Sequence, residues 1–157
     1  MNLKWDDFRG AREHNTDVDA VTSCGIKCAP QFTRDNKIRF EIACYFNAHQ
    51  SWVNHKDAND HLLSHEQGHF DIGEIYARKL RHKLHKHQFK SRNINSQIQE
   101  IYDSVFEDYK KAQALYDKQT GHSIDKKGQS IWDSWIDRQL YRYDGYSGRY
   151  ITSEVKN

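Results

Sequence analysis

Residues 60–80 read "DHLLSHEQGHFDIGEIYARKL" and carry an HExxH pentad at 65–69 among apolar residues with helical spacing. A chain with the same 10 His would contain about 0.03 such pentads by chance. In a helix each residue turns by roughly 100°, so residues four apart point to the same side. His65 and His69 can therefore hold one metal ion, and Glu66 lies beside them where it can accept a proton from water. The stretch predicts a zinc site on a helix.

The composition indicates one polar domain spanning residues 1–157. Hydrophobic residues make up 36% of the 157-residue chain, and aromatic side chains supply much of the apolar volume. The length is sufficient for a core without disulfides or structural metals. A net charge of +2 does not favour nucleic acid as a partner. We also expect no membrane span, because no apolar run is long enough for one. The sequence does not reveal the oligomeric state.

Three cysteines, Cys24, Cys28 and Cys44, do not define a disulfide framework. Pairing any two would leave one over, which is unusual for a secreted fold built on bridges. We expect three packed thiols.

The chain divides into a strand-rich part at 1–55 and a helical part at about 57–141. Strand signals lie in "DAVTSCGI" (19–26) and "KIRFEIACYFN" (37–47), where apolar and polar residues alternate. Three- and four-residue apolar spacing predicts helices at about 57–86, 94–118 and 128–141, the first capped by Asp57 or Asn59. Residues 142–157 read as a C-terminal tail. The pattern favours an α+β class, a small antiparallel or mixed sheet packed on the HExxH helix and followed by further helices.

A catalytic zinc normally has three protein ligands and one open position, so the pentad leaves one ligand to find. Glu74 is five residues after His69, about 140° around the helix, and would need a helix break at Gly73. His122 needs only a chain reversal after the second helix, which Gly121 can provide with a positive φ. His122 is therefore the predicted third ligand, with Asp117 the alternative.

Asp117 has a second interpretation as a carboxylate that orients one of the histidines. Tyr116 is a candidate hydrogen-bond donor to an oxyanion, although a core tyrosine at the end of an amphipathic helix is the more common situation. Gly68, inside the predicted helix, costs about 1 kcal/mol against Ala, and we expect it to let another backbone approach the metal face.

Four blocks of the sequence, one of which contains the pentad, are also informative: "LKWDDFRG", "SWV", "LLSHEQGHFDIGEIYARKL" and "YDKQTGHSIDKKGQSIWDSWI". Together they resemble an uncharacterised bacterial domain family described as zinc-dependent proteases and grouped with the zincin peptidases. The resemblance implies a zincin-like fold with the zinc in a cleft between sheet and helix. It also implies export to the periplasm or beyond, although no signal peptide precedes "MNLKWDDFRG". Ser123 departs from the glycine usual in the family after the downstream histidine.

These observations predict a zinc-dependent metallopeptidase with Glu66 as general base and a peptide or protein as substrate. The peptide would add to an edge strand, either 37–47 or the strand leading to "SWV" (51–53). The rival prediction is a non-catalytic zinc-binding or interaction module, in which a fourth protein ligand closes the site. The basic stretch at 78–92 reads as a solvated helix end.

Overall fold

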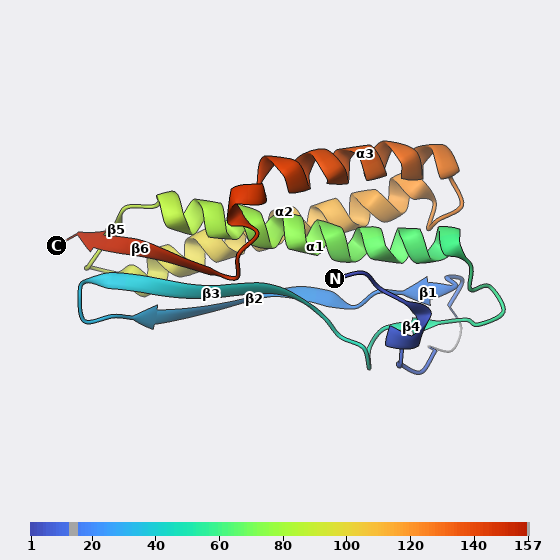
Figure 1. The fold of residues 1–157 in the computed structure, drawn as a ribbon, viewed down its shortest axis with the longest axis horizontal. Helices are drawn as coiled ribbons and strands as arrows, with labels where there is room; N and C mark the ends of the chain where they lie inside the picture. Colours follow the sequence, from blue (N-terminus) through green and yellow to red (C-terminus); the bar gives the residue numbers. More distant parts are fainter. Residues whose placement is uncertain (13–15, 157) are drawn as a thin grey trace.

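The structure, a computed structural model that describes residues 1–12 and 16–156, contains three α-helices and a mixed sheet within those residues (Figure 1). The helices are α1 (Asp60–Lys86), α2 (Ile94–Thr120) and α3 (Lys126–Arg142). The strands are β1 (Ala20–Val21), β2 (Cys24–Phe32), β3 (Lys37–Phe46), β4 (Trp52–Val53), β5 (Phe89–Lys90) and β6 (Tyr150–Lys156), with 3-10 turns η1 (Trp5–Asp7) and η2 (Asp144–Tyr146). The α+β class expected from the sequence is confirmed.

The main sheet has the strand order β2-β3-β6-β5. β2 and β3 form a long antiparallel hairpin, β6 lies antiparallel to β3, and β5 lies parallel to β6. β1 and β4 pair separately as a short antiparallel ribbon. The expectation that residues 37–47 offer a free edge to a peptide is corrected at Lys37–Glu41, because that half of β3 is paired on both sides.

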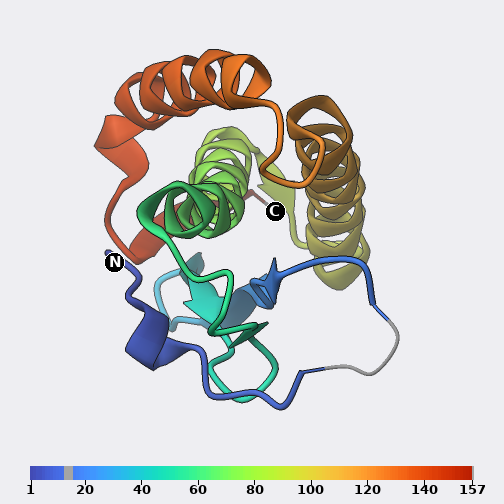
Figure 2. The same cartoon turned by 90° about the vertical axis from the view of Figure 1, so that its right-hand side faces the viewer.

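Helix α1 is the centre of the molecule. Figure 2 shows it between the sheet on one side and α2 and α3 on the other. Its fully buried side chains Ile75, Leu80 and Leu84 belong to the same core as Ile38 and Phe40 of β3. Each such side chain contributes about 1.5–3 kcal/mol through burial. The period-two alternation of β3 and the helical spacing of α1 therefore meet in one core.

The first helix begins where its capping residue predicts. The Asn59 side chain accepts a hydrogen bond from the N–H of Leu62 and satisfies one free donor of the first turn. The helix then continues without a break through Gly73, where a Cβ would lie only 2.7 Å from the sulfur of Cys44. Gly73 therefore serves close helix-to-sheet packing rather than a helix break. Among the described residues, no helix is long and apolar enough to cross a membrane.

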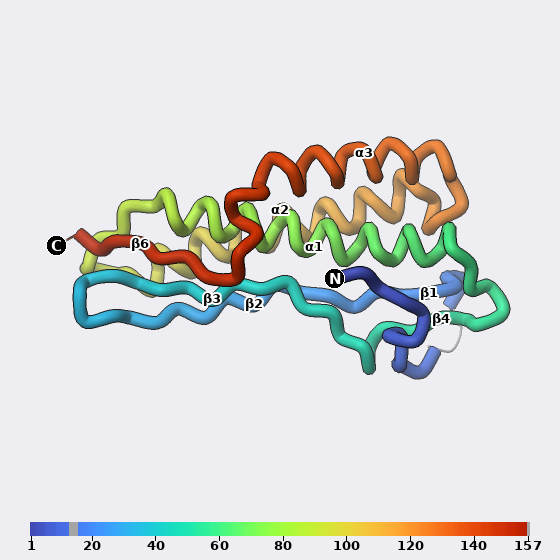
Figure 3. The backbone as a smooth tube through the Cα atoms, in the orientation of Figure 1, coloured from blue at the N-terminus to red at the C-terminus, as the bar shows by residue number. Residues whose placement is uncertain are grey.

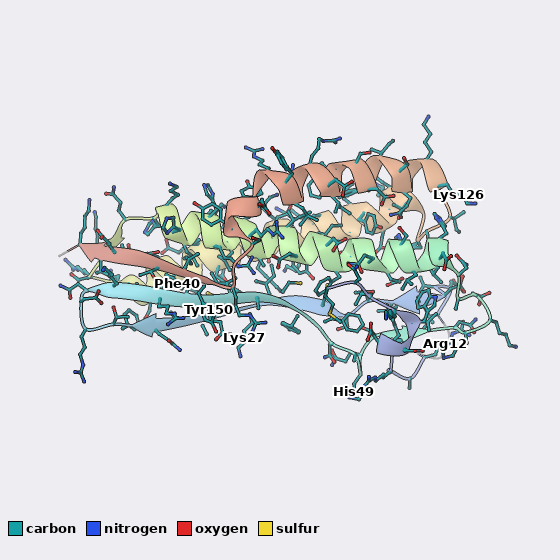
Figure 4. All side chains as sticks on the ribbon, viewed as in Figure 1. Arg12, Lys27, Phe40, His49, Lys126 and Tyr150 are labelled. Carbon is teal, nitrogen blue, oxygen red and sulfur yellow. The ribbon has the colours of Figure 1, made fainter. Side chains whose placement is uncertain are left out.

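The C-terminal segment, given no element by the sequence analysis, contains β6. Figure 3 shows the chain returning after α3 to run beside β3. Ser153 is buried, and its hydroxyl donates to the carbonyl of Leu84 at the end of α1. The other side chains of β6 are exposed or half-buried, so its sequence lacks the strong alternation that identifies a strand. In Figure 4, Phe40 of β3 lies between the sheet and the helices, and Lys27 of β2 projects away from them.

Candidate metal centre

The HExxH pentad occupies the second and third turns of α1. His65 and Glu66 are each 2% exposed, and the His69 side chain is 13% exposed. The two imidazole rings lie 4.8 Å apart, centroid to centroid. The two histidines therefore lie next to each other on one side of the helix, as the four-residue spacing predicts.

Asp117, in the last turn of α2, brings a carboxylate to both histidines. Its Oδ1 lies 3.5 Å from Nε2 of His65 and 3.1 Å from Nε2 of His69. One donor atom from each of the three residues lies within 4.8 Å of the other two. Across residues 1–12 and 16–156, this is the one group of three or more metal-ligating side chains at such spacing. Imidazole nitrogen and carboxylate oxygen are ligands that zinc accepts.

Two glutamines hold the other nitrogen of each histidine. Gln129 of α3 donates to the Tyr116 hydroxyl and to Asp133, so its Oε1 faces His65 Nδ1 at 3.1 Å. An amide oxygen can only accept, so His65 carries its proton on Nδ1. A metal ion would therefore bind at Nε2, the nitrogen that faces Asp117, in place of a proton there.

Gln113 of α2 does the same for His69. Its Nε2 donates to the His69 carbonyl at 2.9 Å, and its Oε1 lies 2.6 Å from His69 Nδ1. Both imidazoles are therefore held in the orientation that a metal ligand needs, with Nδ1 donating to a glutamine and Nε2 facing Asp117. The sequence analysis did not identify either glutamine. A faint signal existed for Gln129, since a glutamine followed by tryptophan is part of the block that carries the resemblance.

Tyr116 packs beneath the site. Its ring stacks on His65 with centroids 4.7 Å apart, and its hydroxyl donates to the His65 carbonyl at 3.0 Å. That proton is not available to an oxyanion, so the candidate role of Tyr116 as an oxyanion donor is corrected to a packing role. A Cβ at Gly68 would lie 2.2 Å from the same hydroxyl. Gly68 therefore leaves space for the side chain of Tyr116, whereas the sequence analysis expected another backbone segment to approach there.

Glu66 presents a carboxylate oxygen that lacks a partner. Its Oε2 is buried and has no hydrogen-bond partner among the described residues. Buried polar atoms are almost always hydrogen-bonded, so such an oxygen marks a place for a bound group or water. Beside three convergent ligand atoms, this oxygen fits a zinc site in which the glutamate faces a water molecule.

The site opens into a cavity of about 300 Å³ between α1, α2 and the segment Val18–Thr22. β1 lies in this segment, and β4 pairs with only one of its edges. The cavity walls combine apolar and titratable side chains, among them Val21, Leu62, Tyr109, His65, Glu66 and Asp117. A larger hollow of about 780 Å³ lies between β2 and α2, but no histidine or carboxylate lines it.

His122 lies beside the metal group and is not part of it. Its Nδ1 is 3.3 Å from the Asp117 carboxylate, and 58% of its side chain is exposed. The reversal expected at Gly121 is present, with φ of 55°, and it continues through His122 at 52° and Ser123 at 77°. Positive φ at Ser123 explains why glycine suits that position. His61 Nε2, 2.7 Å from the Ser123 carbonyl, holds the loop to α1.

Glu74, the weakest of the ligand candidates, is engaged elsewhere. Its Oε1 lies 2.9 Å from Arg78 Nε and 3.0 Å from Arg81 Nη1. Arg81 is itself buried and also donates to the Ile42 carbonyl of β3. Because α1 is unbroken at Gly73, Glu74 points away from the histidines, and its candidacy as a ligand is corrected to an ion pair that joins helix to sheet.

The charges of the site are strongly coupled. Burial tends to raise the pKa of Asp117, but hydrogen bonds from His65 and His69 and the charges of His69 and His122 outweigh it and hold this pKa well below its usual range. Burial tends to lower the pKa of His69, whereas the Asp117 hydrogen bond and the negative charge of Glu66 raise it to about 9. An excess of negative charge therefore surrounds the histidines, which favours a cation.

Fold and site together define an α+β protein with a histidine and carboxylate cluster on its central helix. The chain belongs to the family described as bacterial protein of unknown function (DUF922), which matches residues 43–123. The matched segment contains His65, His69 and Asp117 and ends before Gln129. No curated protein and no solved structure matches the chain.

Proposed function

We propose that this protein is a zinc-dependent hydrolase of the metallopeptidase type. The observation that carries the proposal is the convergence of His65, His69 and Asp117 beside the unpartnered, buried Oε2 of Glu66. Asp117 takes the place of the third ligand that the sequence analysis gave to His122. Its oxygen lies against both imidazoles, whereas His122 pairs with Asp117 and lies outside the group of three ligand atoms.

Zinc, when bound, acidifies a water molecule and polarises a carbonyl group. The residues of this chain supply the rest. Glu66 accepts a proton from the attacking water and returns it to the leaving amine, a contribution of about 10²–10⁴ in rate. Gln113 and Gln129 keep both imidazoles in place, and Tyr116 fills the space behind them.

The surroundings of the site support a peptide as substrate. The free edge of β1 borders the cavity, and an extended chain could hydrogen-bond to it while a peptide bond reaches the metal group. A sheet packed against the HExxH helix, with the site at one end of that helix, also favours the zincin-like fold. The second candidate edge of the sequence analysis, the strand leading to "SWV", is β4. It pairs with β1, and the cavity is lined by β1 and not by β4.

A non-catalytic zinc module is the alternative function. His122 favours it, because this side chain already touches Asp117 and could complete a closed set of four ligands. A closed site would hold α1 and α2 together without leaving room for a substrate. Exposure of the His122 side chain and the cavity above Glu66 favour the open, hydrolytic site.

Metal analysis of the purified protein, combined with hydrolysis of a diverse peptide library, tests the proposal. We expect one zinc per chain, and we expect Glu66→Gln to keep that zinc while hydrolysis falls by at least about a hundredfold. Glu107→Gln, at an exposed site on α2, is the matched control and should change neither quantity. Unchanged turnover in Glu66→Gln would remove Glu66 from the mechanism. Zinc binding without any cleavage by wild type would support the module.

A further inference from the structure

The end of the molecule opposite the metal centre carries a dense group of cations. Figure 1 shows the tip of the β2–β3 hairpin, β5, β6 and the last turn of α1 together at one end, while β1 and the start of α1 lie at the other. We call this surface the basic end and define it by Arg34, Lys37, Lys86, Lys90, Arg92 and Lys156.

The pairing of the strands shows that these side chains are neighbours. Lys90 is the register partner of Lys156 across the parallel pair β5 and β6. Lys37 pairs in register with Glu154, and the N–H of Val155 donates to the carbonyl of Asn36 in the hairpin turn. The cations therefore come from four separate stretches of the sequence and meet only in the folded chain.

Few carboxylates neutralise this surface. Its two acidic side chains are Asp35, which pairs with Lys37 at 3.0 Å, and Glu154. Six cations and two carboxylates give a formal charge of +4 to the basic end, compared with +2 for the whole chain. Within the described residues, the other five cations make no salt bridge. Their charge is directed at solvent.

A hollow of about 490 Å³ lies in the middle of the basic end. Lys37, Lys86 and Lys156 line it together with His85 and His87, and Glu154 is its one carboxylate. The ammonium of Lys156 donates to the amide oxygen of Gln88, a neutral group that does not neutralise the positive charge of the lysine. A hollow with three lysines suits a phosphate-bearing headgroup.

An exposed aromatic side chain distinguishes this surface from a simple cationic patch. Phe32, the last residue of β2, is 58% exposed at the hairpin, and Pro30 on the same strand is also exposed. Phe32 lies in register with the fully buried Ile38, so it shares the core-facing side of the sheet. An exposed aromatic side chain near lysine and arginine is the combination that holds proteins at the interface of anionic membranes.

We propose that the basic end binds the surface of an anionic phospholipid bilayer, with its cations over the headgroups and Phe32 in the interface. Because the metal centre lies at the other end of α1, it would face away from the membrane and stay accessible. The proposal does not depend on zinc chemistry at the site.

Co-sedimentation of the full chain with phosphatidylglycerol-containing vesicles tests this surface. We expect binding to these vesicles, little binding to pure phosphatidylcholine vesicles, and weakening as salt rises. Lys86→Glu combined with Lys90→Glu should weaken binding at least about twentyfold, since each lysine near the surface contributes about fivefold. Phe32→Ser should weaken it at least about threefold.

Matched controls lie outside the basic end. Lys126→Glu combined with Lys127→Glu changes the net charge equally at the start of α3, where Figure 4 labels Lys126. Tyr141→Ser removes an aromatic ring that is 87% exposed. Both controls should bind vesicles like wild type, and circular dichroism should show every variant folded. The proposal is overturned if the wild-type protein does not bind anionic vesicles, or if the control variants lose as much binding as the variants of the basic end. It is also overturned if a DNA duplex binds the protein as tightly as the vesicles do and Phe32→Ser does not change that binding.

Discussion

The two halves of α1 are both buried, but they bury opposite kinds of groups. The first half buries His65 and Glu66 against side chains of α2 and α3. The second half buries Ile75, Leu80 and Leu84 in the core that it shares with β3. One helix thus faces a polar site at its start and an apolar sheet toward its end.

The difference separates function from stability. Burial of apolar side chains stabilises the fold, whereas burial of a polar group costs free energy unless partners compensate it. Burial of the unpartnered Oε2 of Glu66 carries this cost in free energy, and that atom lies at the candidate metal centre. We therefore expect substitutions in the first half of the helix to affect metal and chemistry, and those in the second half to affect folding.

The largest expected effect is the loss of a ligand. Asp117→Ala should weaken zinc binding by about a thousandfold, since a few ligands together supply roughly 10–16 kcal/mol in zinc sites. His122→Ala should weaken it less than about tenfold, because that side chain is 58% exposed and lies outside the group of three ligand atoms. Competition titration with a zinc chelator measures both, with Asp103→Ala on the same helix as control. The reverse order of the two effects would restore His122 as the third ligand.

A substitution in the second half should act on stability instead. Leu80→Ala removes a fully buried side chain, and we expect it to lower the free energy of unfolding by about 2–5 kcal/mol. Glu66→Gln, equally buried, should change it by less than about 1 kcal/mol. Urea denaturation of the metal-free protein gives both values, and Lys83→Ala is the exposed control on the same helix. Similar losses in both variants would mean that the two halves are not distinct.

Gln113 and Gln129 test the polar half of α1 more finely, because each contacts Nδ1 of a histidine and is not itself a candidate ligand. Gln113→Ala and Gln129→Ala should each weaken zinc binding by about 10–100-fold. Nitrogen NMR of the metal-free protein above pH 9, where His69 is neutral, should also show His69 losing its fixed Nδ1–H tautomer in Gln113→Ala, which general destabilisation would not produce selectively. Gln99→Ala, on the exposed surface of α2, is the control. Unchanged tautomers in both variants would contradict the positioning role.

The stability of the metal-free protein should depend on pH mainly through His69, in the first half of α1, and its partner Asp117. The pKa of His69 rises from 6.5 to about 9 on folding, so its stabilising contribution is complete below about pH 6.5 and is lost as pH rises through 9. The lowered pKa of Asp117 acts in the opposite sense, stabilising above about pH 3.8 and failing in stronger acid. We expect a loss on the order of 1–2 kcal/mol between pH 6.5 and 9.5 by denaturation in chelator. A flat profile there would show that the pair does not stabilise the fold.

The sequence predicted the parts that depend on local spacing. The helices at about 57–86, 94–118 and 128–141 correspond to α1, α2 and α3 with small differences at their ends. The four-residue spacing placed His65 and His69 side by side, and the alternation at 37–47 indicated β3. These patterns are readable because helix and strand periods are properties of the backbone itself.

Other features were beyond sequence reasoning because they depend on packing. β6 has no strong apolar alternation and forms a strand only because β3 offers a free edge. Gln113 and Gln129 resemble any surface glutamine until α2 and α3 are placed against α1. The cations of the basic end are likewise scattered along the sequence.

The sequence by itself determined the α+β class, the central helix and the side-by-side placement of His65 and His69, since each follows from short-range periodicity and residue type. Only the tertiary structure decided which distant side chain meets them. Asp117 is in the last turn of α2, and His122 follows the helix five residues later. In the packing of α2 on α1, Tyr116 occupies the space left by Gly68, and the carboxylate of Asp117 lies against both imidazoles. A contact between two helices depends on their packed surfaces together, which no local pattern records.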